Sequence, residues 1–233
     1  MDVSVLTEGG VSMKRILFIS IEGCLYISFL WMDLFGNGMG AISNKVKYIS
    51  ILVCFFYVLT ALEKEGEERD LILLKWAMFF TLLSDTFLLL VKNMGLGVSS
   101  FVVVQLIYRF RLRKCSCFDR KGFSSLGVAV AILLVLFVLG VQVDYVLCIA
   151  VFYFVLFVSN VFYGMTHPVG RMFQIGLFLY FLCDINVALY NLASYVTLSS
   201  MAGEMIYEIS SIAIWLFYLP GQVCLACSVK RGK

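Results

Sequence analysis

The feature that most constrains this chain is a succession of long apolar runs separated by short polar connectors. About 20 apolar residues in a helix cross the hydrocarbon core of a bilayer, so each run is long enough to be a membrane span. We interpret the runs as eight transmembrane helices near residues 16–34, 46–62, 71–91, 95–110, 126–143, 145–165, 172–193 and 206–229. The runs are continuously apolar and do not alternate with a period of two, which excludes a membrane β-barrel. The sequence therefore predicts an all-α polytopic membrane bundle, with residues 1–233 in a single integral membrane domain.

The composition agrees with this interpretation. Of the 233 residues 62% are apolar and 14% are charged, whereas a soluble domain is about 45–50% apolar and about 25% charged. These values exclude a soluble enzyme, a disordered regulator and a secreted disulfide scaffold. The formal net charge is only +3, so we predict membrane lipid as a partner and no binding of nucleic acid.

The basic residues predict the orientation of the spans. With the N-terminus in the cytoplasm, fifteen of the 18 lysines and arginines fall in cytoplasmic segments, and the other three are Lys45, Lys47 and Lys92. A bias of this size favours an even number of spans with both termini inside. The basic connector from Arg109 to Lys121 is then interpreted as a topology anchor next to anionic lipid. The membrane is left open between a bacterial plasma membrane and a eukaryotic endomembrane.

Metal-ligand patterns are missing from the sequence. His167 is the sole histidine, and the pair Cys224-x-x-Cys227 has no second pair to complete a zinc site. The acidic connector from Glu63 to Asp70 is expected to be a solvated turn, because flexible carboxylates do not converge on an ion. No metal and no cofactor are predicted.

Three carboxyl groups lie well inside apolar runs: Glu22, Asp85 and Asp184. An ionisable group at the bilayer centre costs at least about 2.5–3.5 kcal/mol on insertion scales, so it usually faces the bundle interior and serves a function. We favour a functional role for the two aspartates. Glu22 lies only two turns from the cytoplasmic end, where it could equally pair with Lys14 or Lys75.

The two aspartates share a local pattern and a depth. Each follows a small residue and precedes a leucine by five positions, and four spans separate them, so their helices run in the same direction. The pattern suggests a parallel duplication of a four-helix unit. At a rise of about 1.5 Å per residue, Asp85 lies ~21 Å and Asp184 ~20 Å from the cytoplasmic ends of their helices. We therefore expect both carboxyl groups in one site, in the outer half of the membrane.

Four polar residues on two other spans are candidate partners of this pair. Gln105 and Tyr108 lie one turn apart on the fourth span, and Tyr218 and Gln222 flank Pro220 on the last. Two aspartates in one pocket of low dielectric hold their protons with different affinities, which yields a general acid and a general base. The same pair would also suit a proton-coupled carrier.

At these residues the chain resembles the lysoplasmalogenase family, the YhhN-like integral membrane proteins. The resemblance rests on four blocks in the same order and spacing: Ala77 to Leu90 around Ser84 and Asp85, Gly97 to Tyr108 around Gln105, Gly176 to Leu189 around Cys183 and Asp184, and Tyr218 to Gln222. The first two spans match only in hydropathy.

The resemblance implies an eight-helix enzyme that cleaves the vinyl ether bond of a lysophospholipid substrate, a lysoplasmalogen. The products would be a fatty aldehyde and glycerophosphoethanolamine or glycerophosphocholine. Asp85 and Asp184 correspond to the catalytic aspartates of the family, while Gln105, Tyr108, Tyr218 and Gln222 would bind substrate. The reaction parallels glycoside hydrolysis, in which one carboxylic acid donates a proton and a carboxylate stabilises the cation or activates water.

The chain departs from the family pattern at Gln105, where the family has histidine, and at Ser84 and Cys183, where it has glycine and serine. Glutamine does not exchange protons near neutral pH. If the position shuttles protons, the protein is slow or inactive; if it orients a substrate oxygen, glutamine can substitute.

Two alternatives therefore stay open. One is a small proton-coupled transporter, and the other is a non-catalytic lipid-binding member of the family. Transporters often break a helix at the binding level, yet neither aspartate has Gly or Pro within four residues. The lack of both residues disfavours the transporter.

Overall fold

The computed structural model describes residues 13–36, 38–60, 68–112, 122–167, 169–192, 195 and 200–229, and within these ranges the chain is helical and has no strand. The elements are α1 (Met13–Phe35), α2 (Gly40–Thr60), α3 (Glu68–Asp85), the π-helix η2 (Thr86–Val91), α4 (Met94–Leu112), α5 (Gly122–Val138), α6 (Tyr145–Thr166), α7 (Arg171–Asn191) and α8 (Ser200–Ala226). The predicted all-α bundle of eight helices is confirmed.

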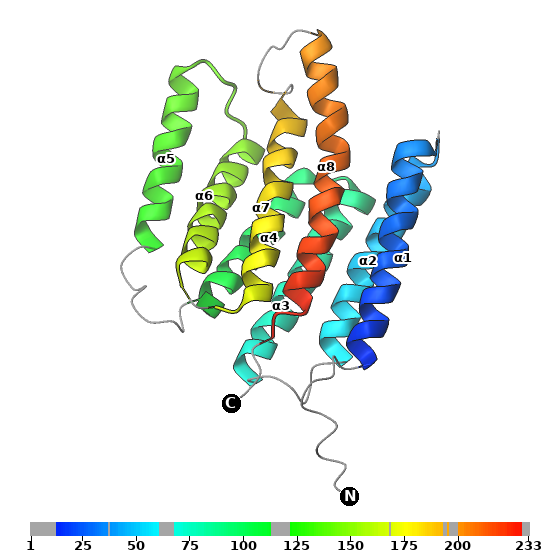
Figure 1. Ribbon diagram of the computed structural model, residues 1–233. Coiled ribbons are helices and arrows are strands. Elements are labelled where there is room, and N and C mark those ends of the chain that lie inside the picture. The colour runs from blue at the N-terminus through cyan, green and yellow to red at the C-terminus, as the bar shows by residue number, and fades with distance from the viewer. Residues whose placement is uncertain are drawn as a thin grey trace, which may run out of the picture.

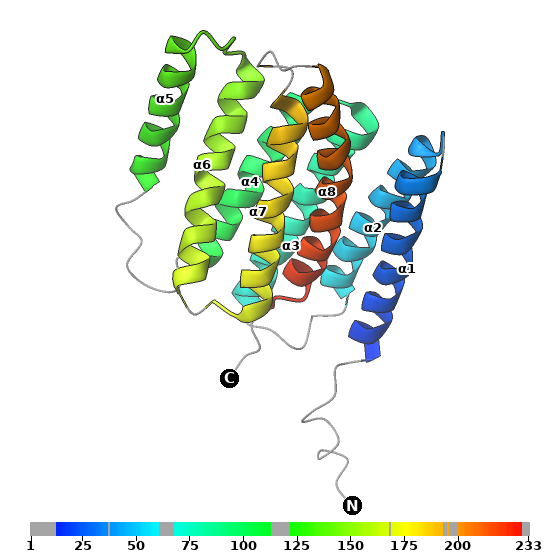
Figure 2. The same ribbon diagram turned by 45° about the horizontal axis from the view of Figure 1, so that its top comes forward.

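The helices stand side by side and alternate in direction along the chain (Figure 1). α1 begins and α8 ends at the same end of the bundle, which we call the lower end; the opposite end is the upper end. Helices α3, α4, α7 and α8 form the middle of the bundle, with α1 and α2 on one flank and α6 and α5 on the other (Figures 1 and 2). α7 packs most extensively on α8, and α5 packs mainly on α6. Because α3 and α7 both rise from the lower end, they are parallel, as the four-span separation predicted.

Seven of the described helices are long and apolar enough to cross a membrane. The exception is α5, whose 17 residues give a length of about 26 Å, slightly less than the ~30 Å of a hydrocarbon core. Large apolar side chains cover the outside of the bundle: Phe162 on α6 is 71% exposed and Leu134 on α5 is 60% exposed. Polar side chains such as Gln105 and Gln222 are fully buried inside. This inverted distribution and the helix lengths identify a multi-pass membrane protein.

Two helix boundaries differ from the predicted ones for local reasons. α2 begins at Gly40, six residues before the predicted start, because its polar first turns are paired: Lys47 forms a salt bridge of 2.7 Å with Asp33, whose Oδ1 accepts a hydrogen bond of 2.5 Å from Ser43. α5 ends at Val138, five residues early, because Gly140 adopts a φ of +78° that turns the chain.

The end of α4 corrects our interpretation of the basic connector. Arg109 and Arg111 belong to the last turns of α4 and are only 5% and 6% exposed. Arg109 donates to Ser125 of α5 (3.3 Å), and Arg111 forms a bidentate pair with Asp70 of α3 (2.9 and 2.8 Å). These two arginines join helices at the lower end, so they do not face lipid headgroups. The rest of that connector, residues 113–121, lies outside the described residues, as do residues 63–67 of the acidic connector, whose last residues, 68–70, form the first turn of α3 in place of the expected solvated turn.

Candidate functional site

Asp85 closes α3 inside the bundle and is 3% exposed. Its Oδ2 accepts a hydrogen bond of 2.6 Å from the hydroxyl of Tyr218 on α8. A length of 2.5–2.7 Å is typical of strong O–H···O bonds to a carboxylate. Tyr218, which we predicted as a partner, therefore holds the Asp85 carboxyl group in one orientation.

Asp184 lies in the upper half of α7 and is partly exposed. Its Oδ2 accepts a hydrogen bond of 2.5 Å from the hydroxyl of Tyr153 on α6. The sequence analysis missed Tyr153, because one tyrosine in a run rich in aromatic residues carries no distinguishing signal. The two aspartates thus have the same type of partner, each supplied by a different helix.

Residues of α7 connect the two aspartate–tyrosine pairs. The ring of Tyr180 lies edge-on to that of Tyr218, with centroids 5.5 Å apart, and both Tyr180 and Tyr153 pack against Phe101 of α4. The rings of Tyr153, Phe101, Tyr180 and Tyr218 therefore form a continuous row between the two aspartate–tyrosine pairs.

The backbone changes its winding directly after Asp85. η2 continues from α3 as a π-helix and ends at Lys92 in a left-handed conformation (φ 57°), with the Lys92 amide bonded to the Phe87 carbonyl. Thr86 supports this geometry, because its hydroxyl donates to the Leu82 carbonyl one turn earlier (2.7 Å). The lack of Gly and Pro near Asp85 did not reveal this change, since a π-helix requires neither residue. Such segments occur often at functional sites.

A hydrogen bond fixes α3 against α4 next to the same aspartate. The hydroxyl of Ser84 donates to the Gly97 carbonyl at 2.6 Å. A Cβ atom on Gly97 would lie 2.4 Å from Leu88 of η2, so only glycine lets the two segments approach this closely. The register of η2 against α4 is therefore set at the residue that precedes Asp85.

The other three predicted partners are fully buried. The structure records no hydrogen bond between any of them and an aspartate. Gln105 accepts from the Asn160 side chain at its Oε1 (3.1 Å), and its carbonyl accepts from the same amide (2.8 Å). Nε2 of Gln105, the Tyr108 hydroxyl and both polar atoms of the Gln222 side chain have no hydrogen-bond partner among the described residues. Only Tyr218 of the four predicted partners is thus bonded to a carboxyl group.

Glu22 is 2% exposed and faces α2, where its Oε1 accepts a weak hydrogen bond from the thiol of Cys54 (3.4 Å). Glu22 therefore belongs to the interior of the bundle, and its recorded partner is a thiol of the neighbouring helix, in place of the lysines that we considered.

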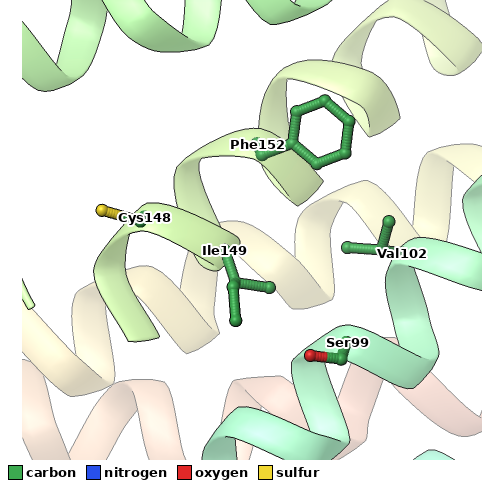
Figure 3. A pocket seen from close by; sticks show the side chains of 5 residues that line it. All are labelled: Ser99, Val102, Cys148, Ile149 and Phe152. Atoms are coloured by element: carbon green, nitrogen blue, oxygen red, sulfur yellow. The ribbon is translucent and has the colours of Figure 1, made fainter. Parts of the chain in front are cut away.

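A groove opens between α4 and α6 close to Tyr153 (Figure 3). Its volume is about 340 Å³, and its lining residues are Ser99, Val102, Cys148, Ile149 and Phe152. Ile149 precedes Tyr153 by one helical turn, so the groove lies one turn above the hydroxyl that holds Asp184. Its lining is mostly apolar and its volume falls in the range of small-molecule sites, about 300–1,000 Å³.

The part of the chain that the structure describes contains no group of three or more His, Cys, Asp or Glu side chains able to hold a metal ion. The chain matches no family model, no curated protein and no solved structure. The resemblance to the lysoplasmalogenase family therefore rests on its four sequence blocks alone.

Proposed function

We propose that the protein is a membrane-embedded hydrolase that cleaves the vinyl ether bond of lysoplasmalogens, with Asp85 and Asp184 as general acid and general base. One observation carries the proposal: two intramembrane aspartates lie on parallel helices, a tyrosine hydroxyl orients each carboxyl group, and a row of packed aromatic rings joins the two tyrosines. An arrangement of two oriented carboxyl groups supports acid–base chemistry in one site.

The reaction uses one protonated and one ionised carboxyl group. The protonated aspartate gives its proton to the alkene carbon β to the ether oxygen, and the α carbon becomes an oxocarbenium-like cation. Water adds to that carbon while the second aspartate accepts its proton. The resulting hemiacetal breaks its carbon–oxygen bond to give a fatty aldehyde and the free hydroxyl of glycerophosphoethanolamine or glycerophosphocholine. In sum, one water is consumed and the protons balance.

The substrate class follows from the surroundings of the pair. A single-chain amphiphile can place its hydrocarbon chain in the apolar groove between α4 and α6, which ends one turn from Tyr153. Gln105 is anchored by two hydrogen bonds from Asn160, which favours an orienting role over a proton shuttle. A histidine at this position is then not required. We propose the bacterial plasma membrane or a eukaryotic endomembrane as the location, because lysoplasmalogens reside in membranes.

The test is hydrolysis of a lysoplasmalogen by the purified protein, with the released aldehyde as the measured product. We expect activity in the unchanged protein and its loss in Asp85→Asn and in Asp184→Asn, because asparagine keeps the shape of the side chain but neither donates nor accepts the proton. Asp144→Asn is the matched control: Asp144 caps α6 through the Leu147 amide (2.7 Å), and asparagine caps a helix equally well. Activity that survives in both aspartate variants rules out this mechanism.

A proton-coupled transporter is the second candidate, and the π-helix after Asp85 favours it. Irregular backbone at a buried carboxyl group is a recurrent feature of ion-coupled carriers. Proteoliposomes with an imposed pH gradient and a pH-sensitive dye inside distinguish the two functions. Proton flux that depends on Asp85, without aldehyde release, would support the transporter. Binding of lysolipid with neither activity would support a non-catalytic lipid-binding protein.

A further inference from the structure

Five buried polar side chains lie at successive depths below the two aspartate–tyrosine pairs. They come from α3, α4, α6 and α8, and we call them the polar layer: Thr81, Gln105, Tyr108, Asn160 and Gln222. Each is at most 1% exposed, and each has at least one polar atom without a hydrogen-bond partner among the described residues. Six such atoms are present, since both polar atoms of the Gln222 side chain are included.

Helical spacing places this layer toward the lower end of the bundle. Thr81 precedes Asp85 by one turn on the rising helix α3, and Gln222 follows Tyr218 by one turn on the descending helix α8. One turn corresponds to about 5–6 Å along the axis. Asn160 lies two turns below Tyr153 on α6, and its bond to Gln105 joins α6 to α4 at that depth.

These six buried polar atoms need hydrogen-bond partners. A buried polar atom without a partner costs about 1–3 kcal/mol, so six in one layer would offset much of the stability of a typical domain, about 5–15 kcal/mol. The set contains donors, acceptors and hydroxyl groups that serve as either, and it carries no charge. Water matches this combination best, because one molecule both donates and accepts and bridges several neutral groups.

The layer also leads toward a polar cluster at the lower end. On the lower side of the layer, the ring of Tyr108 packs edge-on against that of Phe173, with centroids 5.5 Å apart. The guanidinium of Arg111 lies 4.7 Å from the centroid of the Phe173 ring. Arg111 contacts Asp70 and Ser228. Polar groups therefore continue from the aspartates to the lower end, whereas the apolar groove opens beside Tyr153 higher up.

We propose that the polar layer binds ordered water and that this water is the second substrate of the hydrolase. Lipid would then approach through the apolar groove, and water would reach the carboxyl groups from the lower end. The binding of water stands on the structure alone; its use in the reaction rests on the proposed function.

Radiolytic footprinting tests the binding of water. Brief X-ray irradiation turns bound water into hydroxyl radicals that modify adjacent side chains, and mass spectrometry locates the products. We expect modification of Tyr108, although it is fully buried, and none of Phe29, an equally buried ring on the flanking helix α1. In Gln105→Leu with Asn160→Leu, the labelling of Tyr108 should fall to the level of Phe29, because Gln105 lies one turn from Tyr108 and is bonded to Asn160. Gln105→Leu alone changes shape least and guards against misfolding of the double variant; it should lower the labelling in part.

Equal labelling of Tyr108 and Phe29 in the unchanged protein would overturn the proposal, as would labelling of Tyr108 that both variants leave unchanged. The result is independent of the proposed function. Labelling of Tyr108 without aldehyde release would refute the hydrolase but not the binding of water. Aldehyde release without labelling of Tyr108 would refute the binding of water but not the hydrolase.

Discussion

The ion pair between Arg111 and Asp70 allows a quantitative prediction about how the lower end is held. Two hydrogen bonds of 2.9 and 2.8 Å join the side chains, which are only 4% and 8% exposed. For an exposed pair the loss would be about 0–1 kcal/mol. This pair is buried, and removal of one partner of a buried ion pair costs about 3–5 kcal/mol. We therefore expect Arg111→Met to lower the free energy of unfolding by about 3–5 kcal/mol.

A double-mutant cycle separates the pair from its surroundings. The Arg111 guanidinium also donates to Ser228 (3.2 Å to Oγ) and packs on Phe173, so part of the loss belongs to those contacts. The variant with both Arg111→Met and Asp70→Leu has no unpaired charge, and it should be less destabilised than the two single changes added together. Reversible unfolding in mixed detergent micelles, followed by circular dichroism, measures all four proteins. Additive losses, or a loss under about 1 kcal/mol for Arg111→Met, would show that the pair behaves as an exposed one.

Three further predictions concern the site and its packing. Tyr218→Phe and Tyr153→Phe each remove one hydrogen bond to a carboxyl group, worth about 1.5–3 kcal/mol, so the rate of aldehyde release should fall about 10- to 100-fold in each; unchanged rates would contradict the orienting role. Gly221→Ala should destabilise the fold by about 1–3 kcal/mol, because a Cβ atom there would lie 3.2 Å from the Tyr180 amide nitrogen. Gly127→Ala is the control and should not destabilise the fold, because no atom lies within 4 Å of the added Cβ. Equal unfolding curves for the two variants would refute the close α7–α8 contact. Tags at the two termini should be digested by protease from the same side of the membrane, and digestion from opposite sides would exclude the even number of spans.

The helices and their directions could be predicted because hydropathy is a property of a continuous run. Eight apolar runs separated by polar connectors predict eight helices, and an even separation makes the helices of Asp85 and Asp184 parallel. The burial of Asp85 also follows, since an ionisable side chain in an apolar run avoids lipid. The charge pattern did not predict the burial of Arg109 and Arg111 at the lower end. In sequence these arginines resemble a surface anchor, yet they are buried because Ser125 and Asp70 lie within hydrogen-bond distance.

Only the tertiary structure decides which side chains meet. Helical periodicity says which residues share a face, but the rotation of each helix and its crossing with neighbours determine which faces touch. Tyr153 therefore emerged as the partner of Asp184 only from the packing of α6 on α7, and Gln222, a candidate partner, has no recorded hydrogen bond to an aspartate. The π-helix after Asp85 arises in the same way, because Ser84 and Gly97 hold α3 against α4 at a register that a local sequence pattern does not encode.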